Sequence, residues 1–339
     1  MMDETSAAVD SLIADLAKGA QEPPAGDLPA IWTSLEDLGL AGVGLAEDVG
    51  GSGGDLTDLI ALAESVGRHV VSSPLLENGI ARWALGEANV PAPPGVCTVS
   101  MLAPDVVLNL GGGTVDLFEV PWARHAAVLL VVSASGVHLV DLRRESVRIV
   151  PRVNEAGEER DDVTFNCDAA VVVASAPSVA AIRNRLALLW AAVLAGTIES
   201  AYGLTRDYVN GREQFGAPLV RIPAVAGLLA TVKAELVQVE AGLQRAKDHA
   251  LHRLDSAETT AAVAAARVTA ARAATVAARL AHQLHGGMGI TAEYPLHLYT
   301  SRLWAWRDEA GSEHQWATSL GGAAAGLGED AVWDVLTSP

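Results

Sequence analysis

Apolar residues in the first quarter of the chain recur at intervals of three and four positions. This spacing is typical of helices that bury one face, and clusters of Pro and Gly separate the runs. We therefore expect a helical domain over residues 1–95. The residues with this spacing are Val9, Leu12, Ile13 and Leu16, followed by Leu56, Leu59, Ile60, Ala63 and Val66.

The pattern changes between Val96 and Val173, where short runs rich in β-branched residues predict strands. Three such runs cover residues 126–132, 137–140 and 147–150. Three glycines at positions 111–113 stand between apolar runs with no helix after them, which predicts a hairpin turn. We expect a small β domain over residues 96–176.

Helical periodicity returns after Pro177 and continues over long segments. It predicts helices over residues 179–212, 223–254 and 257–284. The last of these is rich in Ala, which favours helix and lets neighbouring backbones approach closely. The pattern predicts a helical bundle over residues 177–339, so the fold class is mainly α with a small β domain.

Composition narrows the range of partners. The 339 residues are 50% hydrophobic, which is enough to bury a sizeable core, and the formal net charge is −18. Such an acidic chain is a poor ligand for nucleic acid or for an anionic membrane surface. Its most apolar stretch, residues 186–198, is too short to span a bilayer. We expect neither a nucleic acid nor a membrane as a partner.

The cysteine count and the N-terminus predict a cytoplasmic protein. Cys97 and Cys167 are too few for a disulfide framework, which fits a reducing compartment. The acidic segment MMDETSAAVD lacks the basic and apolar regions of a secretory leader.

The sequence does not support a metal site or a serine hydrolase. His249 and His252 share a helix face, as do His282 and His285, but no acidic or Cys ligand next to them completes a tetrahedral set. No G-x-S-x-G segment supplies a serine nucleophile. We expect no metal.

The first informative segment is YVNGREQFGAPL, residues 208–219. Here a predicted helix ends in Arg212, Gln214 and Phe215 before a Gly-Ala-Pro turn. Taken alone, it is a helix C-terminus at which a cation complements the helix dipole. A cation next to an aromatic ring can equally bind a phosphate and pack against an aromatic base.

The second informative segment is HQLHGGMGITAEYP, residues 282–295. A long predicted helix runs through Gln283 into Gly286, Gly287 and Gly289. The glycines can simply end the helix. They also permit close approach of the backbone to a pyrophosphate, so that Gln283 could belong to a ligand site.

Together the two segments resemble the acyl-CoA dehydrogenase family, whose members carry Arg-x-Gln-Phe-Gly-x-Pro and, later, Gln-x-x-Gly-Gly-x-Gly followed by Glu-Tyr-Pro. Residues 35–54, with Gly67-Arg68 and Ser73-Pro74 downstream, are similar to the first helical domain of that family. The resemblance covers most of the chain. It implies an N-terminal helical domain, a middle β domain and a C-terminal four-helix bundle.

The resemblance also implies a chemistry. In this family FAD accepts a hydride from an acyl-CoA thioester while a Glu removes the α-proton, and electron-transfer flavoprotein is the expected electron acceptor. The FAD lies across a subunit interface, and the neighbouring subunit contributes the Arg, Gln-Phe and Gly-Gly motifs. The residues that the resemblance assigns to FAD are Arg212, Gln214, Phe215, Gly216, Gln283, Gly286, Gly287 and Ser312.

The parts of the family's pattern that serve a subunit's own flavin and base are altered. The segment from Thr98 to Asp105 replaces the family's Thr-Glu-Pro-x-x-Gly-Ser-Asp loop. Ala310 occupies the ungapped position of the catalytic Glu, and only a slip of one residue brings Glu309 there. The other position used by some relatives falls on about Leu186. Pro223 replaces a Gln found in many relatives and suits the start of a helix.

These departures leave three hypotheses. The chain could resemble the shorter subunit, lacking the base, of actinobacterial heteromeric acyl-CoA dehydrogenases that act on steroid side-chain CoA thioesters. It would then complete the FAD site of a homologous catalytic chain in a heterotetramer. Alternatively, it forms a self-sufficient homotetramer with Glu309 as the base. In the third hypothesis it binds acyl-CoA or serves as a scaffold without redox chemistry.

Overall fold

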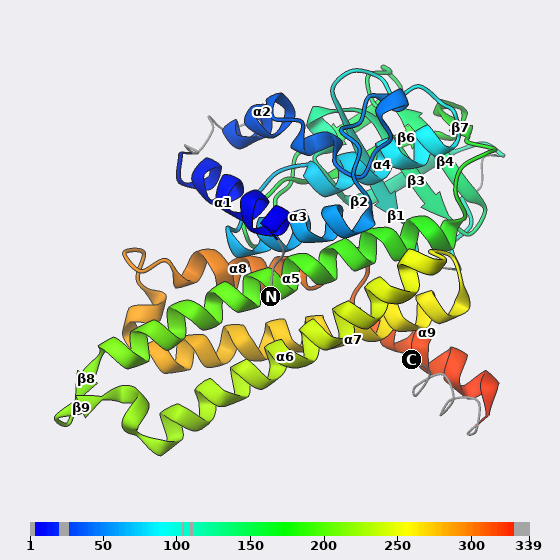
Figure 1. The fold of residues 1–339 in the computed structure, drawn as a ribbon. Helices are drawn as coiled ribbons and strands as arrows, with labels where there is room; N and C mark the ends of the chain where they lie inside the picture. The colour runs from blue at the N-terminus through cyan, green and yellow to red at the C-terminus, as the bar shows by residue number, and fades with distance from the viewer. Residues whose placement is uncertain (1–3, 20–26, 104, 109–110, 329–339) are drawn as a thin grey trace. The chain divides into compact units, whose positions relative to one another are not determined.

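The computed structural model of the protein describes residues 4–19, 27–103, 105–108 and 111–328 (Figure 1). The chain divides into two compact units. The first comprises Met1–Val66 and Val71–Leu189, and the second comprises Gly67–Val70 and Trp190–Pro339. Helix α5 therefore contributes its first turns to one unit and the rest to the other.

The first unit begins with four helices, as the apolar spacing predicts. Leu35, Ile80 and Leu85 are among their fully buried residues. The Ser65 hydroxyl donates a hydrogen bond of 2.8 Å to the Asp10 carboxylate and so connects α3 to α1. The helices are α1 (Glu4–Gly19), α2 (Ala30–Asp37), α3 (Leu56–Arg68) and α4 (Leu75–Glu87).

The strands of the first unit form two small sheets. A four-stranded sheet has the order β1-β3-β4-β7, and a three-stranded sheet has the order β2-β6-β5. Every residue of β3 is buried, which explains its apolar run from Ala126 to Val132. The strands are β1 (Val96–Met101), β2 (Thr114–Pro121), β3 (Ala126–Ser133), β4 (Gly136–Asp141), β5 (Val147–Val150), β6 (Arg160–Asn166) and β7 (Ala170–Val172).

The predicted hairpin turn at residues 111–113 is wrong. β2 follows these glycines, but its partner is β6, far along the chain, and β1 pairs in parallel with β3. The glycines therefore lie in a connection between two different sheets. The predicted strands at 126–132, 137–140 and 147–150 are confirmed as β3, β4 and β5.

The second unit is a helical bundle, and its long helices match the three predicted ranges. Helix α7 packs against α6, α8 and α9, and most of its Ala residues are buried. The Ser256 side chain caps α7 by accepting a hydrogen bond from the amide of Thr259. The helices are α5 (Val179–Gly211), α6 (Pro223–His252), α7 (Ala257–His285), α8 (Leu296–Trp306) and α9 (Glu313–Leu327).

These elements confirm the predicted fold class, which is mainly α with a small β domain between helical segments. Helices give way to strands at Val96, and α5 begins at Val179. The domain boundaries at 95/96 and 176/177 stay a prediction.

Among the residues that the structure describes, two helices are long and apolar enough to cross a membrane when judged by length and composition alone. They are Val179–Gly211 and Ala257–Ile290, and 83% and 61% of their most apolar windows are buried within the protein. Core helices of folded proteins meet the same criterion. The apolar stretch at 186–198 is thus part of a helix of 33 residues, so its short length was the wrong argument against a membrane span.

The end of α3 packs very closely against α5. The Thr197 hydroxyl donates to the carbonyl of Val193 at 2.8 Å and also lies 3.2 Å from the carbonyl oxygen of Gly67, and the Ser200 hydroxyl donates to the carbonyl of Arg68 at 2.9 Å. A Cβ atom on Gly67 would lie 2.0 Å from the carbonyl oxygen of Val193. Only glycine fits there, because the obstructing atom belongs to a helix backbone and cannot turn away.

We expect Gly67→Ala to lower the free energy of unfolding by at least about 3 kcal/mol, because the methyl group must push α3 and α5 apart. Gly79→Ala is the matched control. Gly79 lies inside α4, and a Cβ there meets no atom within 4 Å, so that variant should gain about 0.5–1 kcal/mol from helix propensity. Urea unfolding of both variants measures the contrast, and equal effects would contradict it.

Candidate functional site

The Arg-x-Gln-Phe-Gly segment forms a short hairpin directly after α5. Its strands are β8 (Glu213–Gln214) and β9 (Ala217–Pro218). Phe215 and Gly216 form the turn with φ angles of +55° and +80°, the left-handed pair that a tight two-residue hairpin requires. The amide of Leu219 donates to the carbonyl of Arg212 at 2.8 Å and closes the hairpin at its base.

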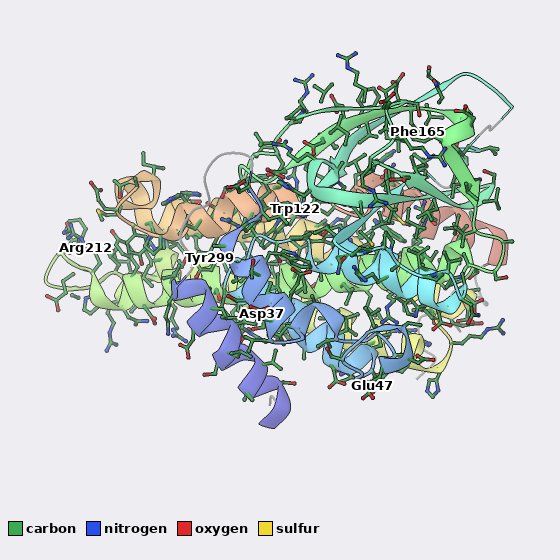
Figure 2. All side chains as sticks on the ribbon, turned by 90° about the horizontal axis from the view of Figure 1, so that it is seen from above. Asp37, Glu47, Trp122, Phe165, Arg212 and Tyr299 are labelled. Atoms are coloured by element: carbon green, nitrogen blue, oxygen red, sulfur yellow. The ribbon has the colours of Figure 1, made fainter. Side chains whose placement is uncertain are left out.

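The hairpin lies at one end of the bundle (Figure 1), and the Arg212 side chain is at its outer side (Figure 2). Arg212, Gln214 and Gly216 are exposed, and the Phe215 ring is 95% exposed. The Arg212 side chain has no hydrogen bond or ion pair with any residue that the structure describes. A cation without an ion pair beside a solvated aromatic ring is a candidate binding surface, since neither side chain packs into the core.

The glycine segment begins where α7 ends at His285. Gly286 has a φ of +57°, and the segment continues as the short helix η6 (Gly286–Ile290). Gln283, Gly286 and Gly287 are exposed, and a Cβ atom on either of these glycines would meet no other atom within 4 Å. The backbone at these two glycines is thus open to a ligand.

Three rings bring the two segments together. The Tyr208 ring, one turn before Arg212, stacks on the His285 ring with centroids 4.4 Å apart and an interplanar angle of 24°. The Tyr294 ring lies 4.9 Å from His285 and 5.8 Å, edge-on, from Tyr208. The Tyr208 hydroxyl also donates to the carbonyl of His285 at 3.3 Å. We call these three residues the ring cluster.

A buried apolar cluster lies next to both segments and supports them. Its buried members are Val209, Leu229 and Leu284, which come from α5, α6 and α7. Leu219 and Val220, just after the hairpin, pack against it. The hairpin therefore rests on the core at both of its ends.

An anionic ligand can bind at this end of the bundle only if a cation offsets the partial negative charge of the helix ends. Both α5 and α7 end here, and the C-terminus of a helix carries a partial negative charge. The exposed guanidinium of Arg212 is the group that offsets this charge and can pair with a phosphate. Together with the open glycine backbone and the Phe215 ring, the donor set fits the phosphate and adenine end of a dinucleotide.

The position that the resemblance assigns to the catalytic base falls on Ala310, between α8 and α9. We call this position the slot. Arg267 of α7 is 1% exposed, and its guanidinium donates to the carbonyls of Arg307 at 2.9 Å and Glu309 at 2.7 Å. Burial lowers the pKa of Arg267 to about 10, against the opposing attraction of Glu309 and Asp308. Ala310 follows with a left-handed φ of +56°. Arg267 thus fixes the backbone of the slot, and at Ala310 a methyl group occupies it.

Ser312 has a structural duty at the same place. Its hydroxyl accepts from the amide of Gln315, and the Gln315 side chain accepts from the Ser312 amide, so the pair forms a capping box for α9. The Trp316 indole donates to the carbonyl of Ala310 at 3.1 Å and closes the turn. Contact of Ser312 with FAD, like the use of Glu309 as a base, stays a prediction.

In the segment that replaces the flavin loop, the first side chain, that of Thr98, is not available to contact a flavin. Thr98 is completely buried, and its hydroxyl donates to the carbonyl of Pro121 at 2.6 Å. Pro104 of this segment lies outside the described residues, whereas Asp105 is exposed. Leu186 is buried in α5 and has no proton-accepting group.

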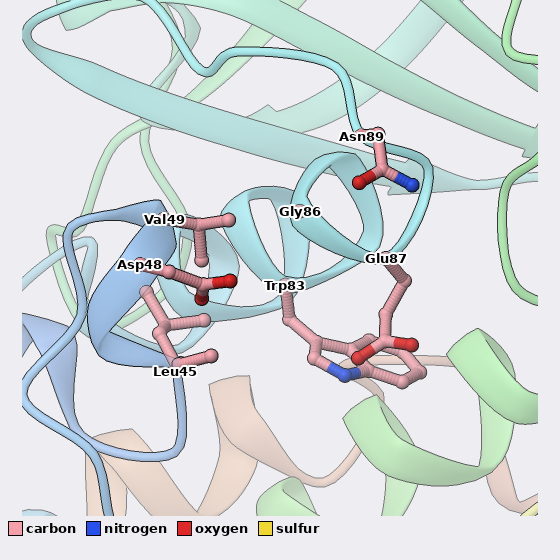
Figure 3. A pocket seen from close by; sticks show the side chains of 8 residues that line it. Leu45, Asp48, Val49, Trp83, Gly86, Glu87 and Asn89 are labelled. Carbon is pink, nitrogen blue, oxygen red and sulfur yellow. The ribbon is translucent and has the colours of Figure 1, made fainter.

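The structure also describes a pocket of about 260 Å³ in the first unit (Figure 3). It lies between the segment around η2 (Glu47–Val49) and α4, and Asp48, Trp83 and Glu87 line it. None of the predicted site residues belongs to it. Over residues 4–19, 27–103, 105–108 and 111–328 there is no cluster of three or more His, Cys, Asp or Glu side chains that could hold a metal ion. The predicted absence of a metal stays a prediction.

Comparison with known proteins identifies the family. Residues 2–88 match the family model of the acyl-CoA dehydrogenase N-terminal domain, and residues 182–313 match that of the C-terminal domain. The chain belongs to the acyl-CoA dehydrogenase family. Its members are flavoprotein oxidoreductases that act on acyl-CoA thioesters, so membership indicates FAD as the cofactor.

Two similar members of this family come from Mycobacterium tuberculosis. Acyl-CoA dehydrogenase FadE28 of Mycobacterium tuberculosis is 30% identical over 304 residues, covering 80% of this chain and 86% of that protein. Acyl-CoA dehydrogenase IpdE2 of the same organism is 29% identical over 282 residues, covering 80% of each chain.

Solved structures share the fold at lower identity. The ChsE4-ChsE5 complex from Mycobacterium tuberculosis includes a chain with a TM-score of 0.81 and 19% identity, over 100% of this chain and 99% of that one. The Tcur3481-Tcur3483 steroid ACAD G363A variant has a TM-score of 0.80 and 24% identity, over 95% and 98% of the two chains.

Burial disfavours the charged forms of the His282 and His285 rings, and this generates a pH dependence of stability. Burial, more than any other cause, lowers the pKa of both rings below the usual value of 6.5. As the pH falls, these two rings therefore bind protons in the unfolded chain before they do so in the folded chain. The contribution of these two rings to the free energy of unfolding should be at its full value above about pH 6.5 and should fall as the pH drops below that value.

His285→Phe keeps a ring in the stack but cannot bind a proton. We therefore expect this variant to lose the part of the acid-induced destabilisation that His285 causes. Compared with the wild type, its free energy of unfolding should fall less steeply between pH 7.5 and 5, by up to about 1.4 kcal/mol per pH unit. Urea unfolding at several pH values provides the slopes. Parallel slopes would contradict the assignment of His285 as a group that the fold keeps neutral.

Proposed function

We propose that this chain is a subunit of an FAD-dependent acyl-CoA dehydrogenase and completes the FAD site of a homologous catalytic chain. The observation that carries the proposal is a contrast within the second unit. Arg212 and the Phe215 ring face solvent, and the Arg212 guanidinium has no hydrogen bond or ion pair with the part of the chain that the structure describes, whereas the slot of the base holds the methyl group of Ala310. This contrast supports a chain that offers a surface for a neighbour's cofactor and relies on another chain for the base.

Each exposed group has a role in this proposal. Arg212 pairs with the pyrophosphate of the neighbour's FAD, and the Phe215 ring packs against the adenine. The backbone at Gly286 and Gly287 lies against the phosphates, since no side chain covers it. FAD, when bound, supplies the redox chemistry of the hydride transfer.

Removal of the α-proton falls to the partner. A methyl group cannot accept a proton, and the carbonyl of the neighbouring Glu309 is held by Arg267. We therefore assign the base to the homologous chain, which would carry the family's Glu-Gly-Thr segment and its Thr-Glu-Pro-x-x-Gly-Ser-Asp loop. In this arrangement the complex is a heterotetramer, works in the cytoplasm and passes its electrons to electron-transfer flavoprotein.

The relatives support a heteromer and a steroid substrate. One structure with the same fold is the ChsE4-ChsE5 complex, and another is the Tcur3481-Tcur3483 steroid ACAD variant. Each of these names joins two proteins. By analogy we propose a steroid side-chain CoA thioester as the substrate of the assembled enzyme.

Co-expression with such a homologous chain tests the proposal. We expect the two chains to co-purify with FAD and to oxidise an acyl-CoA, whereas this chain alone binds little FAD and has no turnover. Glu309→Gln in the complex should leave the rate unchanged, because the partner supplies the base. A homomer that binds stoichiometric FAD, and loses its turnover with Glu309→Gln, would instead establish the self-sufficient enzyme.

In the complex, we expect Arg212→Ala to weaken FAD binding by about 10- to 100-fold, the effect of losing a hydrogen-bonded charge. Arg206→Ala is the matched control on the same helix. Arg206 is exposed and pairs with the adjacent Asp207 at 2.8 Å, so its loss should change FAD affinity by less than about twofold. Titration of the apo-complex with FAD measures both constants, and equal losses would indicate a general effect of charge.

A further inference from the structure

The Arg212 hairpin and the glycine turn have few contacts that could set the distance between them. The side chains of the hairpin face solvent, and Gly286 and Gly287 have no side chains with which to pack. A ligand that bridges both segments needs them at a fixed spacing. That spacing comes from the residues just before each segment, where Val209 and Leu284 share the apolar cluster and Tyr208 on α5 meets His285 on α7.

The ring cluster joins these residues directly. Tyr208 and His285 stack at 4.4 Å, and His285 is only 3% exposed. The Tyr208 hydroxyl donates to the carbonyl of His285, which is the last residue before Gly286. A ring contact and a hydrogen bond thus act on the same pair, and together they fix both distance and rotation.

Contacts from outside the pair orient the two rings further. The Nδ1 atom of His285 lies 2.8 Å from the carbonyl of Ala281, within α7. The Tyr294 ring contacts both rings, and its hydroxyl donates to the carbonyl of Leu204 on α5 at 3.4 Å. Three segments that are distant in the sequence are thereby locked to one another next to the proposed cofactor site.

The geometry points to the ring cluster of Tyr208, His285 and Tyr294 as a positioning element for the cofactor. It sets the spacing between the Arg212 hairpin and the Gly286–Gly287 turn, so that both reach the same dinucleotide. These residues act through the two segments and do not touch FAD. The inference rests on the proposed function, because it concerns FAD held jointly with a catalytic partner.

The test uses the co-expressed complex and compares Tyr208→Leu with Tyr208→Phe. The Leu variant loses the ring contacts, whereas the Phe variant keeps the stack and loses only the hydroxyl. We expect FAD affinity to fall about tenfold or more with Leu and by less than about threefold with Phe. The matched control is Tyr202→Leu, since Tyr202 lies on the same helix and packs against the same apolar cluster but takes no part in the ring cluster.

The readout separates positioning from simple packing. Both Leu variants should lower the melting temperature of the complex by similar amounts, but only Tyr208→Leu should raise the dissociation constant of FAD, measured well below melting. The same constant in both Leu variants would overturn the positioning role while leaving the proposed function intact. A wild-type complex that binds no FAD would overturn the proposed function and this inference with it.

Discussion

Close packing around α7 determines where both parts of the candidate site lie. Alanine side chains on most of its faces let α6, α8 and α9 approach closely, so the helix has little freedom to shift or rotate. Arg267, at the slot of the base, and His285, beside the glycine turn, are 18 residues apart on this helix. At 1.5 Å per residue they are separated by about 27 Å, too far to act on one reacting bond. The slot and the candidate dinucleotide surface are therefore two distinct places in the second unit.

Much of the fold could be predicted, because its signals are local. Pro223 and Ser256 mark the starts of α6 and α7, and the continuous apolar run of β3 identifies a strand buried on both sides. The pairing of strands was not local. The glycines at 111–113 separate two strands that belong to different sheets, and turn chemistry alone does not reveal which distant strand each one joins.

The exposed half of the site could be found from its motifs, whereas the residues that hold it in place could not. Tyr208, His285 and Tyr294 stand in three separate segments, and only the tertiary structure shows that their rings meet. A polar residue in the middle of an Ala-rich helix was the one available signal for Arg267, but its partners are backbone carbonyls, which have no sequence signature. Positioning residues of this kind escape motif reading because they contact the protein and not the ligand.

The three hypotheses for function differ in the ligand that they assign to the exposed side chains of the hairpin. A scaffold without a cofactor leaves an uncompensated Arg212 and a solvated Phe215 ring with no use, although the hairpin has the left-handed turn and the supporting apolar cluster that keep both in place. A homomer gives them a neighbour's FAD, but that neighbour would have the same Ala310 and the same buried Thr98. A homologous partner with an intact base and flavin loop removes this conflict, because the dinucleotide surface and the base then come from different chains.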